Sequence, residues 1–189
     1  IPSPIIDQAI AAELTEGNLI AEIDGSYEFI FLTPLHRAEI GCAFNLNRLN
    51  QGDAPWGAID AEKAIPWVEE QTGMTLSQSQ AAAVRLVLQH KVSVITGGPG
   101  VGKTTLVNSL LKILKAKRVR IGLCAPTGRA AKRLAESTGM EAKTVHRLLE
   151  FDPTQFAFKH NDENPLDLDC LVIDESSMMD VVLMNQLLK

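Results

Sequence analysis

The sequence is poor in aromatic residues, in cysteine and in long apolar runs. Aromatic side chains make up 5% of the 189 residues, so no ladder of rings for stacking nucleic-acid bases is visible. The three cysteines, Cys42, Cys124 and Cys170, are odd in number and far apart, which excludes a disulfide framework and a Cys-x-x-Cys metal site. This usage indicates a reducing, cytoplasmic location. No apolar run reaches about 18 residues, so we expect neither a membrane span nor a membrane partner.

The chain is long enough for one full domain and a small appendage, and its hydrophobic content of 46% can supply a real core. It begins at Ile1 rather than Met, lacks the features of a signal peptide, and stops at Lys189 inside an apolar helical pattern. We therefore expect it to be a section of a longer protein.

Charge is unevenly distributed along the chain, whose net charge is −5. Residues 1–75 carry 12 acidic side chains against 3 Lys or Arg, whereas residues 103–133 carry 9 Lys or Arg and no acid. The asymmetry predicts a domain that faces a polyanion, preceded by an acidic appendage. The alternative is an ordinary solvated helix face that includes one functional lysine.

One glycine-rich stretch, Gly97-Gly98-Pro99-Gly100-Val101-Gly102-Lys103-Thr104, fits the phosphate-binding pattern G-x-x-x-x-G-K-[ST]. A β-branched run at 91–96 predicts a buried strand before it, and apolar residues at helical spacing predict a helix over 105–116. Backbone N–H groups would surround a phosphate, Lys103 would reach the β- and γ-phosphates, and Thr104 would ligate Mg²⁺. The stretch predicts ATP and Mg²⁺ as cofactors; the alternative is a chance glycine-rich turn.

Before this loop, the pattern predicts helices and one hairpin. Strands over 19–23 and 27–31 should pair across a turn at Asp24-Gly25. Helices should cover 35–49 and 60–72, the second interrupted at Pro66. A first helix, over 4–15, is expected to turn inward its residues Ile5, Ile6, Ala9, Ile10 and Leu14. The helix at 35–49 is expected to carry one stripe formed by Ala38, Cys42, Leu46 and Leu49.

The first helix and the hairpin resemble the end of a winged-helix unit. Because this piece is strongly acidic, we expect it to have a structural packing role rather than a DNA-binding one. We place a domain boundary at Gly73. Residues 1–73 would form a small α+β, winged-helix-like segment, and residues 74–189 would form the phosphate-loop domain.

The second half alternates strands and helices. Ser77 should cap a helix that runs to His90. Strands are expected over 120–125 and 168–173, helices over 128–136 and 144–150, and a small hairpin around 156–158. This alternation predicts an α/β fold with a parallel sheet and flanking helices. Ligands then bind at the carboxyl ends of the strands, where we expect Gly97, Thr127 and Asp174.

A second pattern, Leu171-Val172-Ile173-Asp174-Glu175, has the form of a Walker B strand, with apolar residues followed by two acids. Asp174 would hold the Mg²⁺ of the nucleotide, and Glu175 would orient and deprotonate the attacking water. Two carboxylates after a buried strand also suit a solvated turn. The phosphate-binding pattern upstream favours the catalytic interpretation.

These stretches resemble the first motor domain of a superfamily 1 DNA helicase of the RecD-like family, the exonuclease V α subunits. The matching segments cover 76–189 almost continuously: LSQSQAAAV (76–84), VITGGPGVGKTTL (94–106), CAPTGRAAKRL (124–134), KTVHRLLEFDP (143–153), FKHNDENPLDLD (158–169) and LVIDESSMMD (171–180). The resemblance implies a RecA-like P-loop NTPase fold.

The resemblance also implies roles at the nucleotide. Gln80 stands where such helicases place a glutamine that reads adenine through two hydrogen bonds, although its surroundings in the sequence would suit a surface helix residue. Lys103 and Glu175 would be catalytic, and Thr104 and Asp174 would bind Mg²⁺. The nucleotide-binding set is Gln80, Gly97, Gly98, Pro99, Gly100, Val101, Gly102, Lys103, Thr104 and Thr105.

On the DNA side, Thr127, Gly128 and Arg129 match a motif that lies along the backbone of single-stranded DNA. A hydroxyl and N–H groups at a helix N-terminus, together with a guanidinium, suit a phosphate. The alternative is a helix cap followed by an exposed arginine. Thr144 and His146 match a further DNA-side motif, with a structural hydrogen-bonding role for His146 as the alternative.

The leading interpretation is an ATP-dependent DNA helicase acting in recombination and repair, with single-stranded DNA and other exonuclease V subunits as partners. The helicase half of a conjugative relaxase shares these motifs. A non-catalytic nucleotide-binding regulatory subunit is the third interpretation, and Glu175 argues against it because a pure binder can discard the base. The arginine fingers of the family lie beyond Lys189, so we expect residues 1–189 alone to hydrolyse ATP barely or not at all.

Overall fold

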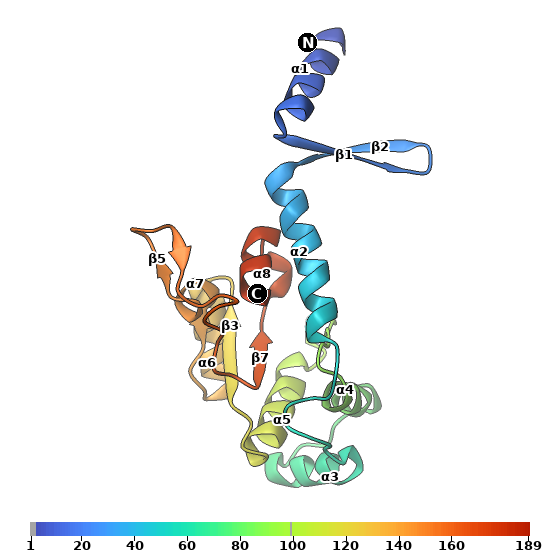
Figure 1. Ribbon diagram of the computed structural model, residues 1–189. Coiled ribbons are helices and arrows are strands. Elements are labelled where there is room, and N and C mark those ends of the chain that lie inside the picture. The colour runs from blue at the N-terminus through green and yellow to red at the C-terminus, as the bar shows by residue number, and fades with distance from the viewer. Residues whose placement is uncertain (1–2, 99) are drawn as a thin grey trace.

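A small parallel sheet of three strands organises the second half of the chain (Figure 1). The structure, a computed structural model, describes residues 3–98 and 100–189. The strands stand in the order β4-β3-β7, and the central strand is the most buried. Their bounds are Ile121–Ala125 for β3, Lys143–Thr144 for β4 and Cys170–Ile173 for β7. The predicted α/β class with a parallel sheet is confirmed, as are the two strands expected at 120–125 and 168–173.

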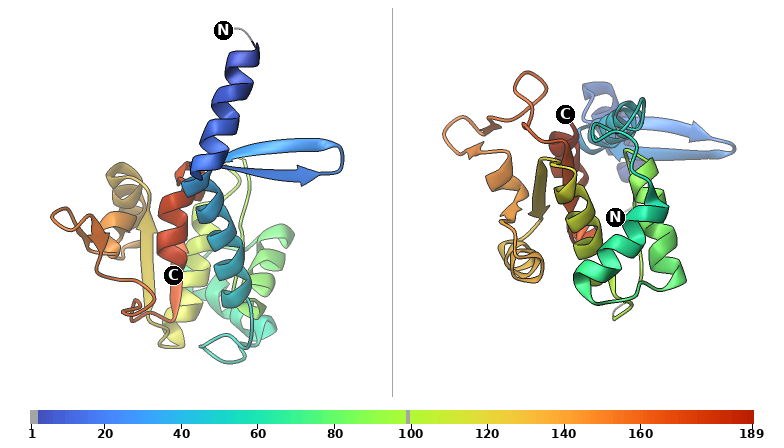
Figure 2. Two further views of the ribbon diagram at one scale, coloured as in Figure 1. Left: turned by 45° about the horizontal axis from the view of Figure 1, so that its top comes forward. Right: turned by 90° about the horizontal axis from the view of Figure 1, so that it is seen from below.

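Four helices pack together beside this sheet (Figure 2). They are α3 (Ala61–Thr72), α4 (Gln78–Gln89), α5 (Lys103–Ala116) and α6 (Gly128–Thr138). One apolar cluster joins α3, α4 and α5, and its most buried members are Val68, Val84, Ile113 and Leu114. Burial of an aliphatic side chain contributes about 1.5–3 kcal/mol. This cluster therefore fixes the position of α5, whose N-terminus follows the glycine-rich loop.

The predicted strand over 91–96 is wrong. Residues 91–98 form no strand, and the side chain of Val94 is 80% exposed, although Ile95 packs against the helical core. In the part of the chain that the structure describes, no strand pairs with this run. A β-branched sequence becomes a strand only when a neighbouring backbone and a packed face support it. Gly97 therefore does not follow a strand, whereas Thr127 and Asp174 follow β3 and β7 as expected.

The N-terminal hairpin is confirmed. It consists of β1 (Leu19–Asp24) and β2 (Tyr27–Leu32), which pair antiparallel with Asp24 opposite Tyr27. The two-residue turn between them begins at Gly25, whose φ of +61° lies in the left-handed region that glycine adopts without strain.

Helix α1 (Ser3–Glu16) forms where it is predicted, but its expected inward face does not. Ile5 is 57% exposed and Ile6 is 44% exposed, while Ile10 and Leu14 are half-buried. The reason is its position: α1 packs chiefly against β1 and extends away from the body (Figure 1). We call residues 3–32 the limb.

Helix α2 (Thr33–Leu49) joins the limb to the body and lies along α8 (Val181–Leu188). The Arg48 guanidinium donates to the carbonyl of Leu188 at 3.0 Å and to that of Lys189 at 3.3 Å, which satisfies carbonyls at the end of α8. The predicted stripe is observed in part. Ala38 is buried, but Leu46 is 39% exposed and Asn45 is buried instead.

Helix α3 runs unbroken through Pro66, contrary to the expected interruption. Ile65 and Val68 are buried on either side of the proline, so tertiary packing holds the helix together where local propensity disfavours it. The helix ends at Gly73, which adopts a left-handed conformation with φ of +65°. The domain boundary at this glycine stays a prediction.

Short elements fill the segment after β4. They are α7 (Val145–Leu148), the hairpin of β5 (Phe151–Asp152) and β6 (Ala157–Phe158), and the 3₁₀ helix η1 (Ser176–Met178) after β7. The small hairpin expected around 156–158 is confirmed. Among the helices of the described residues, none has the length and apolar character needed to cross a bilayer.

Candidate nucleotide and DNA site

The glycine-rich loop leads directly into the N-terminus of α5. Gly100 and Gly102 have φ values of +76° and +82°, which glycine adopts without strain. Helix α5 begins at Lys103, two residues earlier than predicted, and Gly102 is its N-cap. Pro99 lies outside the described residues. The first N–H groups of an α-helix have no partner within the helix, so this terminus can receive an anion.

Lys103 bends back over the loop. Its Nζ donates to the carbonyl of Gly97 at 2.5 Å and to that of Gly98 at 2.8 Å. The ammonium is thus held at the backbone that would surround a phosphate. An anionic phosphate is a stronger acceptor for an ammonium than a carbonyl, so a phosphate can replace these bonds. The neighbouring Thr104 is exposed, whereas Thr105 is half-buried, with its carbonyl accepting from Ser109 Oγ at 2.9 Å.

Gln80 lies in the first turn of α4 and contacts this loop. Its backbone N–H donates to Ser77 Oγ at 3.2 Å, and its Oε1 accepts the Ser77 N–H at 2.9 Å, which makes a capping box. The predicted cap at Ser77 is confirmed. The Nε2 of Gln80 donates to the carbonyl of Gly102 at 3.3 Å. The structure therefore brings Gln80 to the glycine-rich loop.

Asp174 and Glu175 follow β7 directly, and both are exposed. The N–H of Asp174 donates to the carbonyl of Cys124 in β3 at 2.9 Å, and its Oδ1 accepts the Glu175 N–H at 3.0 Å. Glu175 has φ of +52° and ψ of +37°, a left-handed conformation that costs a non-glycine residue about 1–3 kcal/mol. Such strained residues are concentrated at active sites and ligand clamps.

Thr104 carries a hydroxyl and Asp174 a carboxylate, which are donor types that Mg²⁺ accepts when it arrives with a nucleotide. Mg²⁺ is usually held by one or two carboxylates together with substrate phosphates and water, so one hydroxyl and one carboxylate are sufficient protein ligands. Across residues 3–98 and 100–189, no three His, Cys, Asp or Glu side chains gather as a metal cage.

Thr127 and Thr144 are equivalent N-caps at the carboxyl edge of the sheet. Thr127 Oγ1 accepts the Ala130 N–H at 3.2 Å at the start of α6, and Thr144 Oγ1 accepts the Arg147 N–H at 3.3 Å at the start of α7. The parallel register of β3 and β4 sets Ala125 opposite Thr144. Two motifs that are 17 residues apart in the sequence thus meet at one edge.

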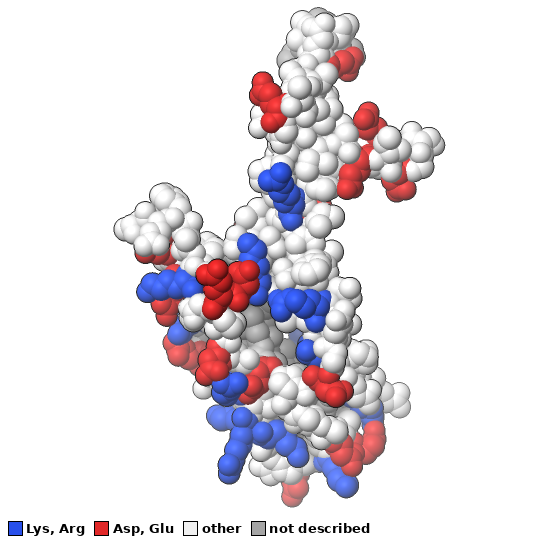
Figure 3. All heavy atoms as spheres, in the orientation of Figure 1, with Lys and Arg blue, Asp and Glu red and all other residues white. Residues whose placement is uncertain are grey.

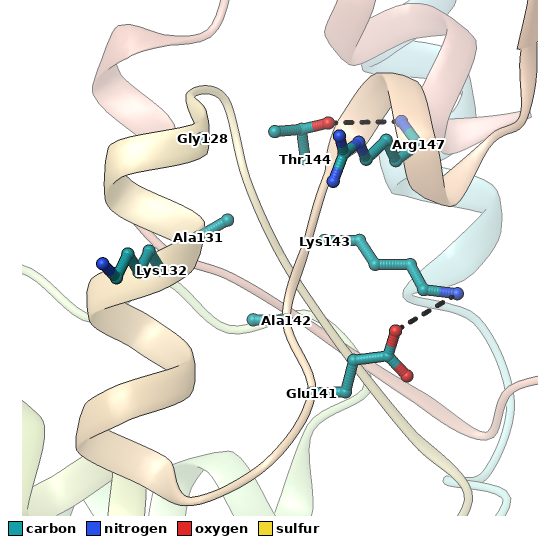
Figure 4. A pocket seen from close by; sticks show the side chains of 8 residues that line it. All are labelled: Gly128, Ala131, Lys132, Glu141, Ala142, Lys143, Thr144 and Arg147. Atoms are coloured by element: carbon teal, nitrogen blue, oxygen red, sulfur yellow. Dashed lines mark hydrogen bonds and ion pairs between the residues drawn. The ribbon is translucent and has the colours of Figure 1, made fainter.

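A pocket of about 300 Å³ opens between α6 and the segment that carries β4 and α7 (Figure 4). Its residues are Gly128, Ala131, Lys132, Glu141, Ala142, Lys143, Thr144 and Arg147. In Figure 4 the guanidinium of Arg147 points toward the gap, whereas Lys132 and Lys143 extend away from it. Lys143 pairs with Glu141 at 3.8 Å. Arg147 is therefore the cation best placed for an anion here, and motif matching did not single it out.

His146 is exposed and lies among aromatic rings. Its ring centroid is 5.8 Å from that of Phe151 and 5.8 Å from that of Phe158, and Phe156 extends the group. Phe156 is 85% exposed. The sequence shows no aromatic ladder, yet folding gathers three phenylalanines and this histidine into one cluster. The signal available in the sequence was the spacing of Phe151, Phe156 and Phe158 around a turn.

The charge asymmetry of the sequence is also visible in space (Figure 3). The limb carries six Asp or Glu and no Lys or Arg. Lys and Arg side chains gather at the end of the body opposite the limb (Figure 3). Arg129 is exposed in the first turn of α6, beside Thr127 and Gly128.

Residues 80–189 match the family AAA_19, an AAA domain. The chain is 39% identical over 159 residues to the ATP-dependent RecD2 DNA helicase of Deinococcus radiodurans, an alignment that covers 84% of this chain and 22% of that protein.

Subunits named RecD of the RecBCD enzyme are similar as well. The protein of Mycolicibacterium smegmatis is 38% identical over 150 residues, covering 67% of this chain and 27% of its own length. The protein of Haemophilus influenzae is 36% identical over 151 residues, an alignment that covers 67% of this chain and 23% of that protein. The chain thus spans about a quarter of the length of these relatives.

Proposed function

Since the chain belongs to the RecD-like family of superfamily 1 helicases, we propose that it is the nucleotide-binding part of a motor that couples ATP hydrolysis to movement on single-stranded DNA. The relatives named as the RecD subunit of the RecBCD enzyme support other exonuclease V subunits as partners. We extend the proposal to a role in recombination and repair, as the family resemblance implies. The observation that carries the proposal is the loop 97–104 at the N-terminus of α5, with Lys103 folded over it.

In this proposal the chain's own residues position the triphosphate. Loop N–H groups and Lys103 bind the β- and γ-phosphates, while Gln80 reads the adenine. Thr104 and Asp174 hold Mg²⁺, which neutralises phosphate charge when bound. Glu175 takes the proton of the attacking water, a contribution of about 10²–10⁴-fold in rate. Its left-handed backbone and exposure at the end of β7 leave its carboxylate accessible to that water.

The DNA contacts are proposed at the carboxyl edge of the sheet. Thr127, Gly128 and Arg129 would follow the phosphate backbone, and the pocket extends this path to Thr144. Arg147 adds a guanidinium suited to a phosphate. The exposed ring of Phe156 offers a surface on which a base can stack.

Calorimetric titration of the 189-residue chain with Mg·ATP tests the nucleotide site. Wild type should bind, and Lys103→Ala should weaken binding by at least tenfold, because a charge-assisted bond to phosphate contributes about 1.5–3 kcal/mol. Lys112 lies in the same helix, and its Nζ donates to the Gln71 carbonyl at 3.2 Å. Lys112→Ala should therefore leave the affinity for Mg·ATP unchanged. Equal affinities of wild type and Lys103→Ala would refute the assignment.

DNA-stimulated ATPase activity of a complete protein that contains this chain would separate the motor from a regulatory nucleotide binder. A motor should lose its stimulated activity on Glu175→Gln while still binding nucleotide. Full activity of that variant would remove Glu175 from its proposed role.

A further inference from the structure

The amide of Gln80 has more hydrogen-bonding capacity than recognition of a base requires. A primary amide carries two N–H donors and two acceptor lone pairs. Oε1 accepts the Ser77 N–H at 2.9 Å, and Nε2 donates one N–H to the Gly102 carbonyl at 3.3 Å. These two bonds use one donor and one acceptor site. The second N–H and the second lone pair are the two groups needed to read adenine.

The contact between Gln80 and Gly102 is close and lies at a structural junction. A Cβ added to Gly102 would stand 2.5 Å from Nε2, so only glycine permits this approach. The Gly102 carbonyl also accepts the Leu106 N–H at 3.0 Å, the first bond of α5. Gln80 therefore holds the carbonyl at which the glycine-rich loop becomes a helix, one residue before Lys103.

We propose that Gln80 is a positioning residue for the phosphate-binding loop, which it orders through Gly102 whatever base the nucleotide carries. This inference rests on the proposed binding of nucleotide at 97–104, and it assigns Gln80 a second task beside adenine. Because the capping box anchors Gln80 to α4, the helical core holds the loop before any ligand arrives. A loop ordered in advance loses less entropy when it binds a triphosphate.

Three variants isolate the contact. Gln80→Glu keeps the acceptor for the Ser77 N–H and removes the donor to Gly102. Gln80→Met removes both bonds without adding a charge, which controls for repulsion between a new carboxylate and phosphate. Ser77→Ala removes the hydroxyl cap of α4 but retains the backbone N–H of residue 77 and the Gly102 contact, so it reports on helix capping alone.

Hydrogen–deuterium exchange of the ligand-free chain reads the positioning directly. The Leu106 amide should exchange about three- to tenfold faster in both Gln80 variants, the effect of losing one net hydrogen bond. It should be unchanged in Ser77→Ala. Unchanged protection in the Gln80 variants, or an equal loss in all three variants, would overturn the inference.

Titration with Mg²⁺-tripolyphosphate, which has no base, provides the second test. Both Gln80 variants should weaken its binding about three- to tenfold and weaken ATP at least as much, while Ser77→Ala should change neither. If only ATP binding suffers, Gln80 acts on the base alone and the inference fails, although the proposed nucleotide site stands. If the wild-type chain binds neither ligand, the proposed function fails and the exchange result decides the inference.

Discussion

Among single residues, Glu175 combines a strained backbone conformation with a proposed catalytic carboxylate, so stability and activity favour different residues at this position. It is a non-glycine residue in the left-handed region, at the point where β7 ends and the two acids begin. Arg118 has a similar φ of +60°, but it follows the C-terminus of α5, at the opposite end of the helix from the glycine-rich loop. Both residues have the left-handed backbone strain, but only Glu175 belongs to the proposed catalytic site.

Glu175→Gly should raise the free energy of unfolding by about 0.5–1 kcal/mol, because relief of the left-handed strain outweighs the added freedom of the unfolded chain. In a complete protein the same variant should lose ATP turnover, since the carboxylate is gone. Urea denaturation and steady-state ATPase assays measure the two effects. Arg118→Gly should give the same stabilisation with turnover intact. If Glu175→Gly is less stable than wild type, the strain is absent in solution.

At the level of elements, two side-chain links hold the strands and helices that frame the site. The first joins the starts of β3 and β7. Asp169 accepts from the Arg120 guanidinium at 2.7 and 3.1 Å and from its backbone N–H at 2.8 Å. These bonds lower the pKa of Asp169 to about 2. The second link packs α2 on α8, where Gly41 meets the Asn185 side chain.

Asp169→Asn should destabilise the chain at neutral pH, because the Arg120 bonds lose their charge. A carboxylate with a depressed pKa stabilises the fold above its unfolded pKa, about 3.9, and loses that contribution as the pH falls toward 2. The gap in urea midpoint between wild type and variant should therefore close between about pH 4 and pH 2. Asp167→Asn, at a far more exposed partner of Arg120, should have a smaller effect. A gap independent of pH would contradict the assignment.

Gly41→Ala should lower the free energy of unfolding by about 1–3 kcal/mol, the range for overpacking a well-packed interface. A Cβ at this position would overlap Asn185 Oδ1 and stand 2.8 Å from its Cγ. Asn185→Ala alone should be close to neutral, since Oδ1 is buried without a hydrogen-bond partner among the described residues.

The double variant Gly41→Ala/Asn185→Ala should recover most of the loss, which a double-mutant cycle in urea would show. Strictly additive effects would mean that the two side chains do not meet.

On the scale of the whole molecule, charge is segregated in a way that bears on DNA. The acidic limb projects from one end, and Lys and Arg gather toward the other (Figure 3). The net charge of −5 therefore conceals a cationic end of the body, distinct from the carboxyl edge of the sheet where the DNA contacts are proposed. Arg147, which lines the pocket, and Phe156, which is exposed, test two different kinds of DNA contact.

Single-stranded DNA should bind this chain weakly and with a strong dependence on salt. Arg147→Ala should reduce the magnitude of the slope of log K against log salt by about 0.7, because one phosphate contact is lost. Phe156→Ala should cost about 1–3 kcal/mol of binding free energy at every salt concentration and leave the slope unchanged. Lys117→Ala, in the basic run but outside the pocket, should change neither. Fluorescence anisotropy with labelled oligonucleotide measures both quantities, and an unaltered slope in Arg147→Ala would exclude it from phosphate contact.

Local patterns were sufficient for several features, because their causes lie within a few residues. The left-handed glycines and the helix start of the phosphate loop follow from their own sequence, as do the Ser77 cap and the turn at Gly25. The strand before Asp174 also needed only an apolar run bounded by a turn. Most residues of the proposed nucleotide site can therefore be predicted from short stretches of sequence.

Tertiary contacts alone settled the remainder, because those features depend on what a segment packs against. The run at 91–96 has strand propensity but no strand beside it, and α1 has apolar residues but extends away from the body. Pro66 stays within α3 because the core holds both sides of the helix. The bond from Gln80 to Gly102 and the pocket at Arg147 join residues that are close only after folding, which no local pattern can reveal.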